Sequence, residues 1–431
     1  MYDVQVTHTR WFSPALLARV VHGRAGADAR PANDLVWDSR LVTPGAAFFA
    51  LPGEQEHGEA YAADALARGA ALVIGPSPRK RGVQVDDPKA ALLRLGRWLR
   101  LGFPAPVAGV SGSVGKTSTK EALARALGWP ATEGNLNTPP ALARFFWHLD
   151  PGAGGAVVEL GIDRPGEMDE LLELVVPDLG VLTAIAPVHL ERLGSLEAVA
   201  AEKLKLLEAS PLRLAHVELA RWGLPEGTRT YGFQGDIDFR GEALELNPEG
   251  TRFRYAGRTL RLRTLGRGAA LAALAALAAA ELLGQDPAAA AERLEAQPPT
   301  PGRLEPIRRG GVLWLNDTYN ASPKALEAAL EVLARAPRPR GVVLGTMREL
   351  GSEAERLHLE AARQVRAACD RALFVGEFAE AMAAGWPQAQ AVATVEEAAE
   401  ALPEWSRGLA SVLVKGSRAL ALERLLEVAG A

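Results

Sequence analysis

The stretch Val107-Ala-Gly-Val-Ser-Gly-Ser-Val-Gly-Lys-Thr-Ser-Thr-Lys120 decides how the middle of this 431-residue chain folds. A short apolar run turns through glycines into a helical pattern, which predicts a strand, a loop and a helix in that order. Such a loop binds phosphate, because its backbone N–H groups and the helix N-terminus face the anion. Lys116 then neutralises a terminal phosphate, and the Thr117 hydroxyl binds Mg²⁺. The sequence therefore predicts a site for ATP and Mg²⁺, the alternative being a glycine-rich turn with a chance Gly-Lys-Thr.

The loop departs from the usual phosphate-binding pattern at one position. Counting back from Gly115, the first glycine of G-x-x-x-x-G-K-T should fall at position 110, where Val110 stands instead. The segment is therefore a variant of the phosphate-binding loop. Its predicted ATP-binding residues are Ser111, Gly112, Ser113, Val114, Gly115, Lys116, Thr117 and Ser118.

Composition limits the class of protein. The length favours several domains, and the hydrophobic and charged fractions are those of a soluble globular protein. A net charge of −4 gives the whole chain no attraction for nucleic acid or anionic lipid. The single cysteine, Cys369, excludes an internal disulfide, and no signal peptide is visible, so we expect a cytoplasmic protein. The longest apolar run, 268–280, is too short to span a bilayer and predicts a buried helix.

Two proline-rich connectors, 103–106 and 297–302, divide the chain into predicted domains 1–104, 105–300 and 301–431. The first domain mixes short strands and helices. The second carries the phosphate-binding loop and two further buried strands, followed by helix-rich sequence. In the third, five apolar strands each precede a helix, which predicts a Rossmann-like, doubly wound parallel sheet with ligands at the carboxyl ends of its strands. The expected fold class is therefore α/β, with a parallel-rich sheet in the second domain.

Four residues outside the loop are candidates for chemistry. Glu159 ends a buried strand after the loop helix, where a carboxylate can hold Mg²⁺ or cap a neighbouring helix. His189 follows the next strand and is either a metal ligand or structural. Lys203 lies in a helix expected to begin at Ser195, where a lysine is usually a solvated surface charge. Arg303 follows the second connector, where it can bind phosphate or simply be a linker charge.

Polar side chains also crowd the strand ends of the third domain. Asp317, Tyr319 and Asn320 follow its first strand, and further polar segments follow at 345–349 and 415–418. No pattern of structural zinc, zincins or serine hydrolases occurs. On residues alone the chain uses ATP and Mg²⁺, and the acceptor of the phosphoryl group stays open.

The pattern over essentially the whole chain resembles the Mur ligases. The segments that carry the resemblance are Asp38-Ser39-Arg40 with Pro44-Gly45, the loop Ser111–Thr117, Asn135-Leu-Asn137-Thr138, Glu159-Leu-Gly, His189-Leu-Glu, Asp317-x-Tyr319-Asn320, Leu344-Gly-x-Met-x-Glu349, His358 and Lys415-Gly-Ser417-Arg418. The third-domain segments follow the type that adds D-Ala-D-Ala. The Asp-Asn-Pro-Arg string of the related amino-acid-adding ligases is absent.

The resemblance implies an enzyme of peptidoglycan precursor synthesis that joins UDP-MurNAc-tripeptide to D-Ala-D-Ala through an acyl phosphate, forming a C–N bond with ADP and phosphate as products. The implied catalytic residues are Lys116, Glu159, His189 and Lys203. Thr117, Glu159, His189 and a carbamylated Lys203 would hold two Mg²⁺ ions. Asn135, Arg303 and Asp317 would complete the ATP site. The implied substrate-binding residues are Ser39, Arg40, Asn137, Thr138, Tyr319, Asn320, Lys415 and Ser417.

The resemblance also assigns a task to each predicted domain. The first would bind the UDP-MurNAc-peptide, the second ATP, and the third the dipeptide while closing on ATP. We expect a monomer that binds no nucleic acid and does not insert into a membrane.

Three residues or segments depart from the family pattern, and they concern mainly the contacts that would hold the adenine of ATP. Gly268-Ala269 replaces the usual His-Asn, Thr346 replaces an Asp, and 209–232 lacks an Asn-Asp pair. Two alternative functions remain at this point. One is another Mur-type ligase, amino-acid-adding or of folylpolyglutamate type, and the other is a non-catalytic ATP-binding switch.

Overall fold

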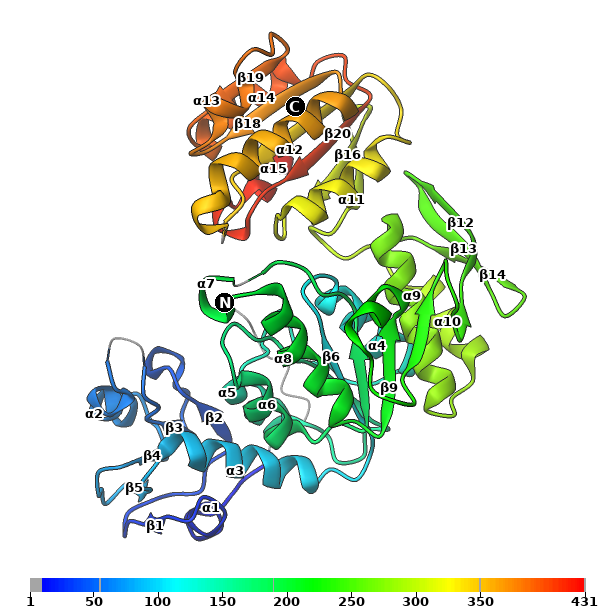
Figure 1. Ribbon diagram of the computed structural model, residues 1–431. Helices are drawn as coiled ribbons and strands as arrows, with labels where there is room; N and C mark the ends of the chain where they lie inside the picture. The colour runs from blue at the N-terminus through cyan, green and yellow to red at the C-terminus, as the bar shows by residue number, and fades with distance from the viewer. Residues whose placement is uncertain (1–9, 54–55, 189, 349, 430–431) are drawn as a thin grey trace. The chain divides into compact units, whose positions relative to one another are not determined.

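The computed structural model in Figure 1 describes residues 10–53, 56–188, 190–348 and 350–429. The chain forms two compact units. The first comprises Met1–Ala124, Gly128–Ile185 and Ser195–Arg229, and the second comprises Arg125–Leu127, Ala186–Gly194 and Thr230–Ala431. Each unit is α/β, which confirms the predicted class. Within the described residues, no helix has both the length and the apolar character that crossing a membrane requires.

The first unit begins with a five-stranded sheet of order β1-β5-β4-β3-β2. Its strands are β1 (Arg24–Ala25), β2 (Asp34–Val36), β3 (Ala46–Phe49), β4 (Leu72–Gly75) and β5 (Gly82–Gln84), and only β1 is antiparallel to its neighbour. Its helices are α1 (Pro14–Val20), α2 (Ala62–Ala67) and α3 (Pro88–Leu101). Asp87 caps α3 and Pro88 occupies its first turn, where a proline needs no hydrogen-bond acceptor and favours the start of a helix.

The same unit contains the strands of the phosphate-binding region in the parallel order β9-β8-β6-β7. These are β6 (Val107–Ser111), β7 (Ala156–Glu159), β8 (Leu179–Leu182) and β9 (Leu212–His216). The helices of this region are α4 (Lys116–Leu127), α5 (Pro139–His148), α6 (Glu167–Val175) and α8 (Leu196–Glu208), whereas the last residues of α4 and the short helix α7 (Leu190–Leu193) are counted with the second unit. Ser195 caps α8 as expected. β6 is buried along its whole length, so its carboxyl end carries the loop out of the core.

The sequence prediction of helix-rich structure after β8 is incomplete. The second unit contains the short parallel pair β10 (Arg229–Gly232) and β11 (Phe239–Arg240), and an antiparallel meander of β12 (Glu242–Asn247), β13 (Gly250–Tyr255) and β14 (Arg258–Leu262). Ala256 and Gly257 both have positive φ in the tight turn between β13 and β14. The predicted buried helix is present as α9 (Gly266–Leu282), followed by α10 (Pro287–Glu295).

The last sheet has the order β15-β16-β20-β17-β18-β19. Its strands are β15 (Glu305–Arg309), β16 (Val312–Asp317), β17 (Arg340–Gly345), β18 (Arg371–Val375), β19 (Ala389–Val392) and β20 (Ser411–Lys415). All pairs are parallel except β15 with β16, and the sequence did not reveal β15. The helices are α11 (Pro323–Leu333), α12 (Ala354–Ala368), α13 (Ala379–Ala383), α14 (Val395–Trp405) and α15 (Leu425–Val428).

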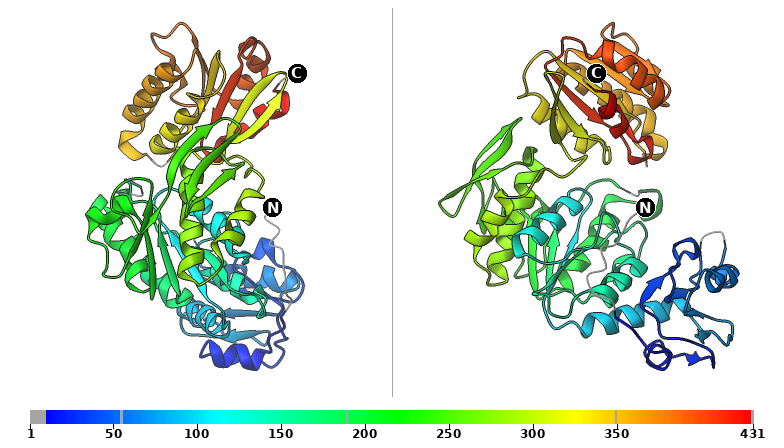
Figure 2. Two further views of the ribbon diagram at one scale, coloured as in Figure 1. Left: turned by 90° about the vertical axis from the view of Figure 1, so that its right-hand side faces the viewer. Right: turned by 180° about the vertical axis from the view of Figure 1, so that it is seen from behind.

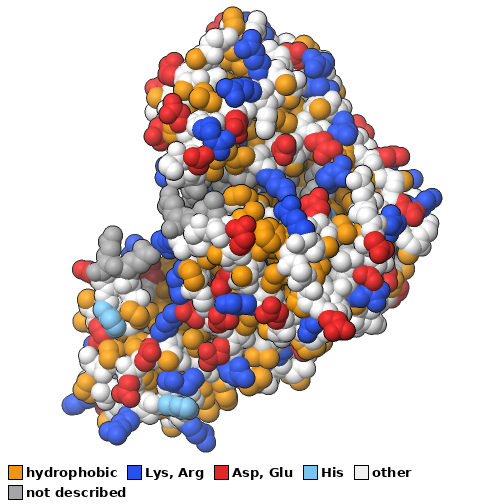
Figure 3. Space-filling model, in the orientation of Figure 1, with side chains coloured by type: hydrophobic (Ala, Val, Ile, Leu, Met, Phe, Trp, Pro, Cys, Tyr) orange, Lys and Arg blue, Asp and Glu red, His pale blue; other side chains and the backbone are white. Residues whose placement is uncertain are grey.

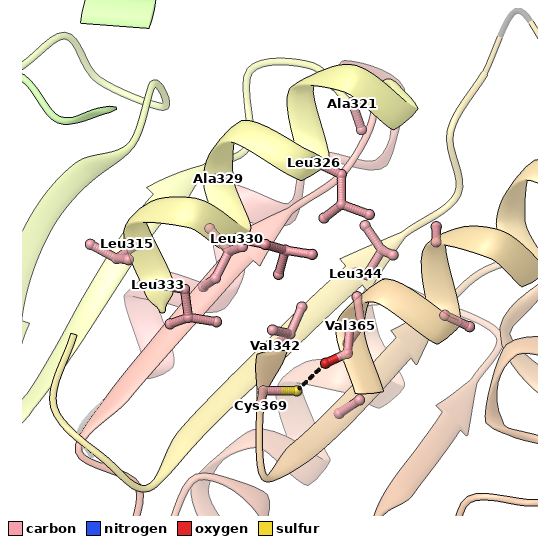
Figure 4. Packing of buried hydrophobic residues seen from close by; sticks show 14 of the residues in the cluster. Leu315, Ala321, Leu326, Ala329, Leu330, Leu333, Val342, Leu344, Val365 and Cys369 are labelled. Atoms are coloured by element: carbon pink, nitrogen blue, oxygen red, sulfur yellow. Dashed lines mark hydrogen bonds between the residues drawn. The ribbon is translucent and has the colours of Figure 1, made fainter. Parts of the chain in front are cut away.

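Helices cover both faces of this sheet, as a doubly wound fold requires (Figure 2). One apolar core joins the sheet to α11, α12 and α13, and a second joins its other face to α14 and α15. In Figure 4, Leu326 and Leu330 of α11 point toward Leu344 of β17. Cys369 lies at the edge of this core, its thiol contacts the Val365 carbonyl at 3.2 Å, and burial raises its pKa to about 12. The thiol is therefore structural.

Candidate active site

The glycine-rich loop joins β6 to α4, as predicted, and the end of β8 shapes it. Gly112 has φ +148°, and a Cβ at this position would lie 2.0 Å from Thr183 Oγ1. Thr183 Oγ1 donates to the Val114 carbonyl at 2.6 Å, and the Ser113 amide donates to the Ala184 carbonyl at 2.7 Å. Glycine is required at position 112 because any side chain would displace this contact.

The two residues that would meet phosphate and Mg²⁺ begin α4. Lys116 Nζ donates to the Gly112 carbonyl at 2.9 Å, so its ammonium lies over the loop backbone. Thr117 is buried in the first turn, and Ser118 beside it is half-buried. Ser111 is fully buried and donates to the Leu160 carbonyl at 2.8 Å. The loop is thus hydrogen-bonded to the core at its start, whereas its residues at the N-terminus of α4 are left accessible to a ligand.

Glu159 ends β7 next to β6, because Val110 pairs with it across the two strands. Asn137 Nδ2 donates to Glu159 Oε1 at 3.1 Å. The other oxygen, Oε2, is buried and has no hydrogen-bond partner among the residues that the structure describes. A buried carboxylate oxygen is costly unless a cation or a donor satisfies it. The donor set therefore fits Mg²⁺, which prefers carboxylate oxygens.

Lys203 is a buried residue of α8 and no solvated surface charge, since its exposed fraction is 1%. Burial and the nearby charge of Lys116 lower its pKa to about 7, although Glu202 and Glu159 act in the opposite direction. The amine is therefore neutral in a large fraction of molecules near pH 7, and a neutral amine is the form that can add CO₂. Its neighbour Lys205 instead forms ion pairs with Asp169 and Glu202, at 2.7 and 2.9 Å.

His189 and Glu349 lie outside the described residues. Within the described ranges, no three His, Cys, Asp or Glu side chains form a group that could hold a metal ion. A site built on Glu159 thus needs further ligands, and the Thr117 hydroxyl, His189 and a modified Lys203 are the predicted ones. Asn135 is exposed in the segment before α5, and Thr138 is exposed at the N-terminus of that helix.

The predicted nucleotide-substrate segment of the first sheet is only partly exposed. Asp38 caps a single turn over Ser39–Leu41, and its carboxylate binds the Arg40 guanidinium at 2.7 Å. Ser39 is buried, whereas Arg40 is exposed. Arg40 is therefore available to a ligand, and Asp38 holds the local turn.

In the third domain, two residues predicted to bind different substrates bind each other. Lys415 Nζ of β20 lies 2.6 Å from Asp317 Oδ2 of β16 and donates to the Asn320 carbonyl at 3.0 Å. Lys415 is buried, so this pair compensates its charge. The Asn320 side chain is used locally, because its Oδ1 accepts from the Ala321 amide at 2.8 Å. The ion pair joins the ends of two adjacent strands.

Arg303 stacks on an aromatic ring instead of lying free in the connector. Its guanidinium carbon is 4.0 Å from the centre of the Tyr319 ring, and the Tyr319 amide donates to the Gly302 carbonyl at 3.0 Å. These contacts hold the connector against the end of β16.

Ser417 and His358 organise the loop after β17. Ser417 Oγ accepts from the Arg348 amide at 2.9 Å. His358 Nε2 accepts from the Met347 amide at 2.8 Å, and its Nδ1 is 2.6 Å from the Ala354 carbonyl. Burial lowers the pKa of His358, which keeps the ring neutral with Nδ1 as the donor. Thr346, where the family has Asp, is buried in this loop.

Sequence reasoning missed a buried ionic cluster between the first sheet and α5. Asp34 accepts two hydrogen bonds from Arg144, both at 2.8 Å, and lies 2.7 Å from His148 Nε2. Burial alone would raise the pKa of Asp34, but the hydrogen bonds from His148 and Arg144 outweigh it and lower the pKa. These partners are more than one hundred residues apart in sequence, and no local pattern could pair them. Lys120, buried and donating to the Gly134 carbonyl at 2.8 Å, was missed too.

Comparison with known proteins gives three matching family descriptions. Residues 34–97 match the Mur ligase family catalytic domain, 110–280 the Mur ligase middle domain, and 302–418 the Mur ligase glutamate ligase domain. Each matched segment falls inside one predicted domain, while the predicted boundaries themselves stay a prediction.

The relatives agree with these matches. The chain is 32% identical to UDP-N-acetylmuramoyl-tripeptide–D-alanyl-D-alanine ligase of Escherichia coli, over 90% of this chain and 92% of that protein. A crystal structure of MurF from Acinetobacter baumannii has a TM-score of 0.88 at 27% identity and covers 97% of this chain and 98% of its own. MurF of Thermotoga maritima in complex with ADP has a TM-score of 0.81 at 28% identity, covering 92% and 96%. The similarity thus runs through all three domains.

Proposed function

This chain belongs to the Mur ligase family, and from that premise we propose that it is the ATP-dependent ligase that adds D-Ala-D-Ala to UDP-MurNAc-tripeptide in peptidoglycan precursor synthesis. The observation that carries the proposal is the site at the carboxyl ends of β6 and β7. There the phosphate-binding loop adjoins a buried Glu159 carboxylate with an unpartnered oxygen, in a chain similar throughout to UDP-N-acetylmuramoyl-tripeptide–D-alanyl-D-alanine ligases.

The reaction proceeds in two steps. The terminal carboxylate of the tripeptide attacks the γ-phosphorus of ATP, which gives an acyl phosphate and ADP. The free amine of D-Ala-D-Ala then attacks the acyl carbon, loses a proton, and the tetrahedral intermediate collapses to the amide and phosphate. Lys116 leaves the Gly112 carbonyl to bind the transferring phosphoryl group, whose charge it stabilises. Domain closure keeps water from the acyl phosphate.

Thr117, Glu159, His189 and a carbamylated Lys203 are the proposed holders of two Mg²⁺ ions. When bound, these ions neutralise charge that develops on the phosphoryl oxygens. Lys203 reaches this role by adding CO₂ to its neutral amine, which forms a carbamate and releases one proton. The low pKa that burial gives this amine supports the step, because an ordinary lysine is almost entirely protonated near neutral pH.

The remaining roles follow the three-domain division. The first domain binds the UDP-MurNAc-peptide with Ser39 and Arg40, assisted by Asn137 and Thr138. Asn135, Arg303 and Asp317 complete the ATP site. Tyr319, Asn320 and Ser417 bind the dipeptide, while Lys415 holds Asp317 and the Asn320 backbone in place through the contacts described above. The enzyme is proposed to act as a monomer.

Phosphate release is the deciding experiment. We expect release from ATP only when UDP-MurNAc-tripeptide and D-Ala-D-Ala are both present. Turnover with UDP-MurNAc-dipeptide and a single amino acid would instead indicate an amino-acid-adding ligase, and turnover with a folate and glutamate a folylpolyglutamate-type ligase. ATP binding without any acceptor-dependent turnover would leave only the ATP-binding switch.

A further inference from the structure

The first domain carries a hollow that the proposed reaction does not use. It has a volume of about 570 Å³ and lies between α1 and α3. Leu16, Val20, Trp98 and Leu101 supply its apolar lining. The opposite side of α3 packs on α5 and α6, so the hollow lies on the face of α3 that is turned away from the phosphate-binding region. We call this surface the α1–α3 groove.

The apolar side chains of the groove are unusually open to solvent. Leu101 is 60% exposed and Trp98 is 40% exposed, and Trp11, which precedes α1, is 60% exposed. Among the described residues, every large hydrophobic side chain that is exposed lies between positions 11 and 101. Two tryptophans and a leucine on one small domain are a costly exposure unless something covers them.

The groove is also positively charged. Arg19, Arg94 and Arg97 line it together with His22, and no Asp or Glu does. Arg97 donates to the Glu173 carbonyl and Arg94 to the Val21 carbonyl, both at 2.9 Å. Within the described part of the chain, none of the three arginines forms an ion pair, and Arg94 Nε is buried without an acceptor. The positive charge is therefore uncompensated at the groove.

This charge is concentrated in the segments that form the groove. Residues 10–30 and 79–101 carry eleven Lys and Arg against three Asp and Glu, although the whole chain has a net charge of −4. Figure 3 shows Lys and Arg side chains along its lower edge, over the elements α1, β1 and α3 of Figure 1.

We propose that the α1–α3 groove docks the enzyme on the surface of an anionic phospholipid membrane. Tryptophan prefers the boundary between headgroups and acyl chains, and Leu101 can enter the same layer. Each arginine near an anionic surface adds further attraction, and apolar contact combined with a basic patch supplies the two signals that stable attachment needs. Because the groove faces away from the phosphate-binding loop, docking leaves the ATP site free.

Flotation of the full-length protein with vesicles tests the proposal. We expect binding to phosphatidylcholine vesicles that contain phosphatidylglycerol, little binding to pure phosphatidylcholine, and release by salt. The Arg19→Gln/Arg97→Gln pair should lower the partition coefficient about twenty-five-fold, since each charge contributes about fivefold. Leu101→Ser tests the apolar part and should lower it as well.

A matched control removes the same charge elsewhere. Arg356→Gln/Arg424→Gln changes two exposed arginines of the third domain, which should leave vesicle binding unchanged. All variants should retain acceptor-dependent phosphate release, so a failure of docking is distinguishable from a failure of the proposed reaction. Equal binding of the two vesicle types, or equal loss in both double variants, overturns the proposal. A different outcome is that the wild-type protein forms a dimer and binds no vesicles, with only Arg19→Gln/Arg97→Gln abolishing the dimer. That result would overturn the proposal and show that the groove binds a second copy of this chain.

Discussion

Replacing Lys203 by alanine is expected to abolish ligase turnover while leaving the protein folded. The residue is buried in α8, and its pKa falls to about 7 because burial and Lys116 disfavour the ammonium. If this lysine becomes a carbamate, its removal deletes an anion from the proposed metal site. Loss of one preorganised charge at such a site costs roughly 10²–10³ in rate.

The size of the pKa change also predicts the effect on stability. Relative to the ordinary pKa of 10.5, a value of about 7 means that holding the ammonium in this environment costs about 5 kcal/mol. The unfolded chain binds more protons than the folded one between these two pKa values, so stability rises with pH across this window. Lys203→Met removes the titrating group. It should therefore unfold with a free energy at least that of wild type at pH 7 in bicarbonate-free buffer, and with a weaker dependence on pH.

Three measurements separate the carbamate from a structural lysine. Phosphate release should fall in Lys203→Ala and recover partly when acetate or formate fills the site. A carbamate resonance in ¹³C NMR after addition of labelled bicarbonate should disappear in the variant. Lys205→Ala is the matched control on the same helix, because its exposed ion pairs are worth about 1 kcal/mol or less. Full turnover by a folded Lys203→Ala protein would refute the reasoning.

Four further results are expected. Lys116→Ala should lose about 10²–10³ in kcat with an unchanged melting temperature, and wild-type-like turnover would exclude the loop from phosphoryl transfer. Gly112→Ala should lose ATP binding in calorimetry, since its Cβ would lie 2.0 Å from Thr183 Oγ1, whereas Gly268→Ala, which meets nothing within 4 Å, should bind normally. Asn320→Ala should raise the KM for D-Ala-D-Ala more than that for ATP, and the reverse order would move the dipeptide site elsewhere. Asp34→Asn should lower the free energy of unfolding, measured in urea, by about 3–5 kcal/mol at neutral pH. Below pH 4 the loss should be smaller, because the Asp34 carboxylate stabilises the fold only when it is ionised. Equal losses at the two pH values would contradict this explanation.

Elements that depend on local pattern could be predicted from the sequence. The strand, loop and helix around Lys116, the capped starts of α3, α8 and α11, and the parallel strands of the last sheet all follow from periodicity and capping. Even the departure at Val110 has a local explanation, because β6 continues to Ser111 and the loop begins only at Gly112. The meander β12–β14 was overlooked although Phe253 and Tyr255 alternate with arginines and Ala256-Gly257 forms a turn.

Contacts between distant segments could not be predicted in this way. Nothing in the sequence near Asp317 indicates that Lys415 neutralises it, because their contact exists only after β16 and β20 pair. The same holds for Asp34 with Arg144 and His148. For Lys203 the sequence alone favoured a solvated charge, and only the resemblance pointed to a buried, modified residue.

The net charge of the chain illustrates the same difference between average and local properties. A value of −4 suggested no attraction for anionic lipid, but screening limits electrostatic interaction to about 8–10 Å at physiological salt. A membrane in contact with one face therefore responds to the charges on that face and is screened from carboxylates on other domains. At the α1–α3 groove those charges are Arg19, Arg94 and Arg97, with no acidic residue in the lining. Local charge, placed by the packing of α1 beside α3, is accordingly the quantity that should govern docking.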